Sequence, residues 1–97
     1  MDCKYDALSS ARSVEEIVRL TRDYLTSWTR EELERLPDSC RPGRVSSPRD
    51  IEFWADRLAD ESVKAVLFLD DERKLDRMTN HFLIASVRIR QLSPALA

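Results

Sequence analysis

Apolar side chains recur at steps of three and four residues along much of the chain, which is the period of an amphipathic α-helix. In the first such segment, Ser13 and Glu16 match a capping box, a signature of a helix start. The stripe that follows consists of Val14, Ile17, Val18, Thr21, Tyr24, Leu25 and Trp28. We therefore expect an amphipathic helix that begins at Ser13 and continues to about Trp28.

A second capping box, Thr29 and Glu32, follows directly and predicts a new short helix. Pro37 ends this helix, because a proline disfavours the helical conformation of the residue before it. The same proline opens the clearest loop of the sequence. Within that loop, Pro42 and Gly43 fit the central pair of a type II turn, in which the glycine takes a positive φ angle.

Ser47, Pro48 and Asp50 predict the start of a third helix, with the serine as its N-cap. The apolar stripe of this helix consists of Ile51, Trp54, Ala55, Leu58 and Ala59. The apolar run 63–69 fits either a continuation of the helix or a buried strand, since periodicity does not separate the two in a short run. We favour the helix, because no turn residue separates this run from the stripe.

The last segment predicts a long apolar helix that Pro94 ends. Its core stripe consists of Leu75, Met78, Phe82, Ala85, Ile89 and Leu92. Apolar residues also lie off this stripe, so the helix is apolar nearly all round, as buried helices are. The other predicted helices barely cover it, and we therefore expect a symmetric homodimer, with a four-helix monomer as the alternative. The candidate interface residues are Phe82, Leu83, Ile84 and Val87.

These segments predict an all-α fold, a small irregular helical bundle of three main helices and one short helix. The alternative is an α+β fold with a strand near residues 63–69. A chain of 97 residues has the length of one domain. We expect residues 1–12 to be a flexible leader, residues 13–92 to form a single helical domain, and residues 93–97 to be a tail.

Composition removes several classes of function. The chain contains one glycine, which excludes the glycine-rich phosphate loops of nucleotide-binding folds. It has 16 basic and 18 acidic side chains, and it therefore lacks the overall basic field that nucleic-acid-binding domains show. Residues 50–76 carry nine acidic and four basic side chains, whereas residues 77–97 carry three arginines and no acidic residue. We disfavour nucleic acid as a partner.

The same sequence predicts a soluble protein of the cytoplasm. Cys3 and Cys40 are too few for a disulfide framework. The N-terminus has no apolar stretch typical of a secretion signal. The longest run without a charged residue, 78–87, is too short to span a membrane. We therefore expect no association with a membrane.

No residue pattern predicts catalysis. Cys40 and His81 form the only cysteine–histidine combination inside the predicted domain, and no cysteine-hydrolase signature surrounds them. One histidine and two distant cysteines do not make a structural zinc site. Glu52, Asp56 and Asp60 share a face of the third helix, where carboxylates could bind magnesium, but nearby basic residues such as Arg57 and Lys64 favour a solvated, salt-bridged surface. We expect no catalytic residue, no metal and no cofactor.

A group of arginines precedes the third helix. Helix N-termini bind anions through their amides, and arginine adds bidentate contacts to phosphate or carboxylate. The candidate anion-binding residues are Arg41, Arg44, Ser46, Ser47 and Arg49. A solvated basic loop beside acidic helices is the simpler interpretation.

Our leading hypothesis for function is a small non-enzymatic protein of bacterial type. It would serve as a protein–protein interaction or adaptor module with an unidentified protein partner. The alternative is a small helical hydrolase or an anion- or phosphate-binding protein that uses the acidic helix faces or the Arg41–Arg49 loop. A nucleic-acid-associated regulator is a weaker alternative.

Overall fold

The computed structural model describes residues 6–65 and 72–93. Within these ranges the helices are α1 (Asp6–Ser9), α2 (Val14–Leu25), α3 (Arg30–Glu34), the short 3₁₀ helix η1 (Asp38–Cys40), α4 (Pro48–Ala65) and α5 (Glu72–Leu92). The described part contains no strand, which confirms the all-α prediction. Residues 63–65 of the alternative strand belong to α4. Residues 66–69 of that strand, and residues 94–97 of the expected tail, lie outside the described ranges.

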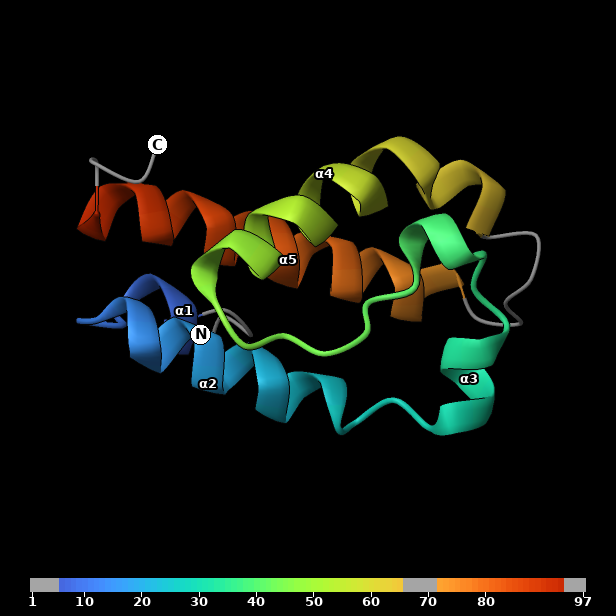
Figure 1. The fold of residues 1–97 in the computed structure, drawn as a ribbon, viewed down its shortest axis with the longest axis horizontal. Coiled ribbons are helices and arrows are strands. Elements are labelled where there is room, and N and C mark those ends of the chain that lie inside the picture. Colours follow the sequence, from blue (N-terminus) through green and yellow to red (C-terminus); the bar gives the residue numbers. More distant parts are fainter. Residues whose placement is uncertain (1–5, 66–71, 94–97) are drawn as a thin grey trace.

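The other long helices are arranged around α5 (Figure 1). In that view α4 lies along one side of α5 and α2 along the other, and α1 also contacts it. The predicted stripe of α5 faces the core, where Leu75, Met78, Phe82, Ala85 and Ile89 are all buried. The remaining apolar core residues are Leu8, Ala11, Ile17, Val18, Trp28, Leu36, Cys40, Val45, Ile51, Ala55 and Leu58. The three main helices of the prediction are thus α2, α4 and α5, with α3 as the short one.

The predicted helix starts are confirmed. Ser13 Oγ accepts a hydrogen bond from the Glu16 amide at 3.2 Å. The Glu16 carboxylate accepts from the amide of Arg12, one residue earlier than a capping box places it, at 3.0 Å. Thr29 and Glu32 form the complete capping box, with both reciprocal bonds present. These bonds satisfy amide groups that have no partner within the helices.

Part of the segment 1–12, which we expect to be a flexible leader, is described by the structure. The single-turn helix α1 is present there, and Leu8 and Ala11 are buried. The guanidinium of Arg88 on α5 donates two hydrogen bonds to the Ala11 carbonyl, at 3.0 and 2.8 Å. The segment is thus packed against α5. Because α1 is a single turn, the sequence shows no helical period there. Residues 1–5 lie outside the described ranges.

The loop between α3 and α4 is packed against the rest of the chain. Cys40 and Val45 are buried, and η1 contacts α4. Gly43 has no positive φ angle, so the type II turn predicted for Pro42 and Gly43 is wrong. A Cβ atom added at Gly43 would meet nothing within 4 Å. The position therefore has no structural need for glycine.

We expect Gly43→Ala to leave the fold intact and to raise the free energy of unfolding by about 0.4–1 kcal/mol. Alanine at a compatible position removes conformations from the unfolded chain, and no neighbour opposes the added methyl group. Urea denaturation followed by tryptophan fluorescence measures the difference from the wild type. A loss of stability would show that the backbone at Gly43 does not tolerate a side chain.

Candidate functional site

The interface between α2 and α5 contains a buried histidine. His81 on α5 is 8% exposed, and its Nε2 atom lies 3.1 Å from Thr21 Oγ1 on α2. The imidazole also stacks on the Tyr24 ring, with 4.5 Å between ring centroids and 11° between ring planes. Burial lowers the pKa of His81 to about 4, so the ring is neutral at pH 7. His81 therefore serves as a packing and hydrogen-bonding group between the two helices.

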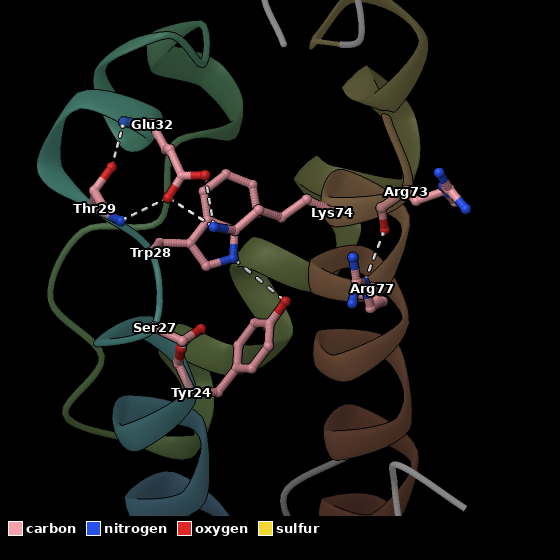
Figure 2. A network of polar contacts seen from close by, with 8 residues as sticks. All are labelled: Tyr24, Ser27, Trp28, Thr29, Glu32, Arg73, Lys74 and Arg77. Atoms are coloured by element: carbon pink, nitrogen blue, oxygen red, sulfur yellow. Dashed lines mark hydrogen bonds and ion pairs between the residues drawn. The ribbon is translucent and has the colours of Figure 1, made fainter. Parts of the chain in front are cut away.

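The same interface continues into a polar network that joins α3 to α5 (Figure 2). The Trp28 indole donates to the Tyr24 hydroxyl at 3.3 Å, and the Lys74 ammonium lies 5.1 Å from the Trp28 ring centroid. The two Glu32 carboxylate oxygens accept from Lys74 Nζ at 2.7 and 2.6 Å. Glu32 also accepts from the Thr29 amide at 2.9 Å. One residue thus caps α3 and binds it to α5.

These contacts favour the ionised form of Glu32. The hydrogen bond from Lys74, followed by that from the Thr29 backbone, lowers the pKa of Glu32 to about 2. A pocket of about 410 Å³ opens beside the pair, and it is lined by Tyr24, Ser27, Glu32, Lys74 and Arg77. Because the Glu32 carboxylate and the Lys74 ammonium bind each other, we interpret the pair as a structural ion pair and not as a catalytic one. The sequence pattern does not reveal this ion pair, since Glu32 and Lys74 are 42 residues apart.

We expect Lys74→Met to lower the free energy of unfolding by about 1 kcal/mol and to reduce its dependence on salt. Methionine keeps an apolar stem near Trp28 but removes the ammonium that Glu32 binds. Urea denaturation at low and at high ionic strength measures both effects. Arg30→Met is the matched control, because Arg30 pairs with Glu34 only at the surface. Equal losses in the two variants would contradict this role of Lys74.

Of the candidate anion-binding residues, Arg41 is engaged within the chain. Its guanidinium donates to the carbonyl groups of Leu33, Glu34 and Leu36 at 2.8, 3.0 and 2.6 Å. These carbonyls lie at the end of α3, where a helix leaves acceptors without partners and where a positive charge is favourable. Arg41 also pairs with Asp38 at 3.0 Å. The contacts give Arg41 a capping role on α3.

Ser46 and Ser47 lie at the start of α4, but a carboxylate of the same chain binds their amides. Asp50 Oδ2 accepts from the Ser46 amide at 3.0 Å and from the Ser47 amide at 3.1 Å. These bonds, first that from the Ser46 backbone, lower the pKa of Asp50. Arg44 and Arg49 are exposed. An incoming anion would have to displace Asp50, and anion binding at this helix start stays a prediction.

A second pocket, of about 390 Å³, adjoins the start of α4. It is lined by Val14, Glu15, Val18, Arg19, Arg22, Ser46, Ser47 and Pro48. Its two arginines come from α2 and not from the loop that the sequence pattern selected. The pattern places Arg19 and Arg22 on the polar side of α2, and it contains no signal that residues 46–48 lie near them.

One side of α5 exposes apolar side chains. Leu83 is 38% exposed and Val87 is 53% exposed, while Ile84 is half-buried. Because Leu83 and Val87 are four residues apart, they lie on the same side of the helix. We call this exposed side of α5, around Leu83 and Val87, the outer face. Phe82, the remaining candidate interface residue, is 0% exposed and belongs to the core of the chain itself.

Among the described residues, no group of three or more histidine, cysteine, aspartate or glutamate side chains is placed to hold a metal ion. No helix within residues 6–65 and 72–93 has the length and the apolar character needed to cross a membrane. Comparison of the chain with protein-family models, curated proteins and solved structures finds no match.

Proposed function

We propose that the chain is a non-enzymatic protein-interaction module of the cytoplasm that docks through the outer face of α5. The observation that carries this proposal is the pair of exposed apolar side chains, Leu83 and Val87, on consecutive turns of one helix. Contiguous exposed apolar patches are typical of surfaces that bind protein partners. The simplest partner is a second copy of the chain, which would form a symmetric homodimer.

A third large apolar side chain is exposed in the described part of the chain, but its surroundings differ. The Phe53 ring on α4 has the Arg57 guanidinium 4.9 Å from its centroid, and Trp54 contacts it edge-on at 4.9 Å. Cation–aromatic and aromatic pairs stabilise an exposed ring within its own chain. Leu83 and Val87 are aliphatic and form no such pairs. Burial against a partner would stabilise them by removing their apolar surface from water.

The reactive groups of the interior support a non-enzymatic role. His81 is buried and neutral, and Cys40 is buried. Lys74 is only partly buried, but Glu32 binds its ammonium. A general acid or base must come within hydrogen-bond reach of its substrate, which burial in a core prevents. A buried thiol also fits a cytoplasmic protein, because thiols stay reduced in that compartment.

We expect the wild-type chain to form a dimer with a micromolar dissociation constant, and Val87→Asp to weaken it about tenfold or more. The apolar patch is small, and small interfaces bind weakly. An aspartate within this patch opposes association, because burying an unpaired carboxylate is costly. Sedimentation velocity over a range of protein concentrations measures the fraction of dimer.

Phe53→Asp is the matched control for this experiment, since it replaces another exposed apolar side chain on a helix with aspartate. It should leave the dimer unchanged, because Phe53 lies on α4 and not on the outer face of α5. A wild-type chain that stays monomeric at several hundred micromolar contradicts the proposal. Equal dissociation by the two variants contradicts it as well.

A further inference from the structure

The outer face of α5 carries opposite charges at equal distances from Leu83. Asp76 lies seven residues before Leu83, and Arg90 lies seven residues after it. Seven residues are close to two helical turns, or about 10 Å of rise, so the three side chains lie on one side of the helix. Asp76 is exposed, and the Arg90 side chain is 55% exposed. Along this side of α5, Asp76 therefore precedes the apolar pair and Arg90 follows it, and the exposed Arg73 and Arg77 flank Asp76.

We propose that two copies of the chain pair through this face with their α5 helices antiparallel and with Leu83 of each copy at the twofold axis. The inference rests on the proposed function, since it names the register of that dimer. A twofold axis at Leu83 places Asp76 of each copy opposite the partner's Arg90, because the two residues are equally far from the axis. An ion pair then closes each end of the apolar contact.

The order of charges selects this orientation over a parallel one. In a parallel pair Asp76 would meet the partner's Asp76, and Arg90 would meet the partner's Arg90. Like charges that face each other across an interface oppose association. The antiparallel pair brings opposite charges together at both ends, so the same surface serves both copies.

Arg90 is held in position within its own chain. Its Nε donates to Glu52 Oε1 on α4 at 3.1 Å, and the Glu52 side chain is half-buried. A guanidinium carries five N–H donors, so this bond leaves donors for a second carboxylate. Because the arginine is ordered before a partner arrives, the loss of side-chain freedom on binding is smaller.

Charge reversal tests the register directly. We expect Asp76→Arg alone and Arg90→Asp alone each to weaken the homodimer about tenfold or more, because like charges then meet at both ends. An equimolar mixture of the two variants should regain association as a heterodimer, in which opposite charges meet again. Sedimentation velocity with one variant carrying a fluorescent label measures the heterodimer.

Asp23→Arg is the matched control, since it makes the same change at an exposed position of α2 and should leave the dimer unchanged. Circular dichroism checks that each variant is folded, and an unfolded variant would not regain association in the mixture. A mixture of folded variants that stays monomeric overturns the inference.

The two proposals fail in different ways. If the charge reversals leave intact a dimer that Val87→Asp dissociates, the antiparallel register is wrong and the proposed function stands. If the wild-type chain is monomeric at several hundred micromolar, the outer face does not pair two copies of the chain, and both proposals are overturned.

Discussion

Phe82→Ala is expected to lower the free energy of unfolding by about 3–5 kcal/mol, the cost of truncating a large buried aromatic side chain. Phe82 is 0% exposed and lies on the same buried stripe of α5 as Met78 and Ala85. Its truncation leaves a cavity that the neighbouring side chains refill only in part. Because small domains are stabilised by about 5–15 kcal/mol, this loss is a large part of the total. Urea denaturation followed by tryptophan fluorescence measures it.

Leu83→Ala provides the matched control at the next position of the same helix. Leu83 is 38% exposed, and we expect its truncation to cost less than about 1 kcal/mol in the monomer. The measurement is made at a protein concentration at which sedimentation velocity finds only monomer, so that association does not add to the stability of the wild type. Comparable losses at Phe82 and Leu83 would show that the assignment of core and outer face on α5 is wrong.

The last helix shows how far periodicity predicts structure. The steps of three and four residues identified Leu75, Met78, Phe82, Ala85 and Ile89, which are all buried, and Leu92, which is half-buried. The pattern does not say which sides of an apolar helix other elements cover, because that depends on where α1, α2 and α4 pack. Phe82 was for this reason predicted both as a core residue and as a candidate interface residue. The packing places it in the core.

Contacts between distant residues were outside the reach of the sequence pattern. The capping box of Thr29 and Glu32 is local and was predicted, but the bond of Glu32 to Lys74 depends on how α3 lies beside α5. The bonds from Arg88 to the Ala11 carbonyl likewise join opposite ends of the chain. The helical period and the capping residues can be predicted from a single sequence, but which helices pack against each other cannot.

In the Arg41–Arg49 loop, the sequence correctly predicts the start of a helix but does not show what binds the charged residues beside it. The start of α4 at Pro48 was predicted, and Ser46 and Ser47 lie beside it. The carbonyl groups that Arg41 binds belong to the preceding helix, and the carboxylate that binds the serine amides is that of Asp50. Charged residues near a helix end therefore suggested an external ligand where the chain supplies partners of its own.

Lowering the pH from 7 to 4 is expected to remove about 3 kcal/mol of stability through His81 alone. The pKa of His81 is about 4 in the folded chain, below the ordinary value of 6.5 that the unfolded chain retains. Between these values the unfolded chain binds more protons than the folded one, so protons favour unfolding. The stability contribution is fully present above pH 6.5 and is lost as the pH falls towards 4. The chain has one histidine, which assigns this window to His81.

His81→Gln separates this effect from the titration of the carboxylates. Glutamine keeps a polar group near Thr21 but does not titrate, so the variant should lose stability at pH 7 and depend less on pH between 6.5 and 4.5. Urea denaturation at pH 7.5, 6.5, 5.5 and 4.5 measures both curves, and the difference between them isolates the histidine. The proton signals of the imidazole should titrate near pH 4 in the folded wild type. A ring that titrates near 6.5, or two parallel curves, would mean that His81 exchanges protons with water as freely in the folded chain as in the unfolded one.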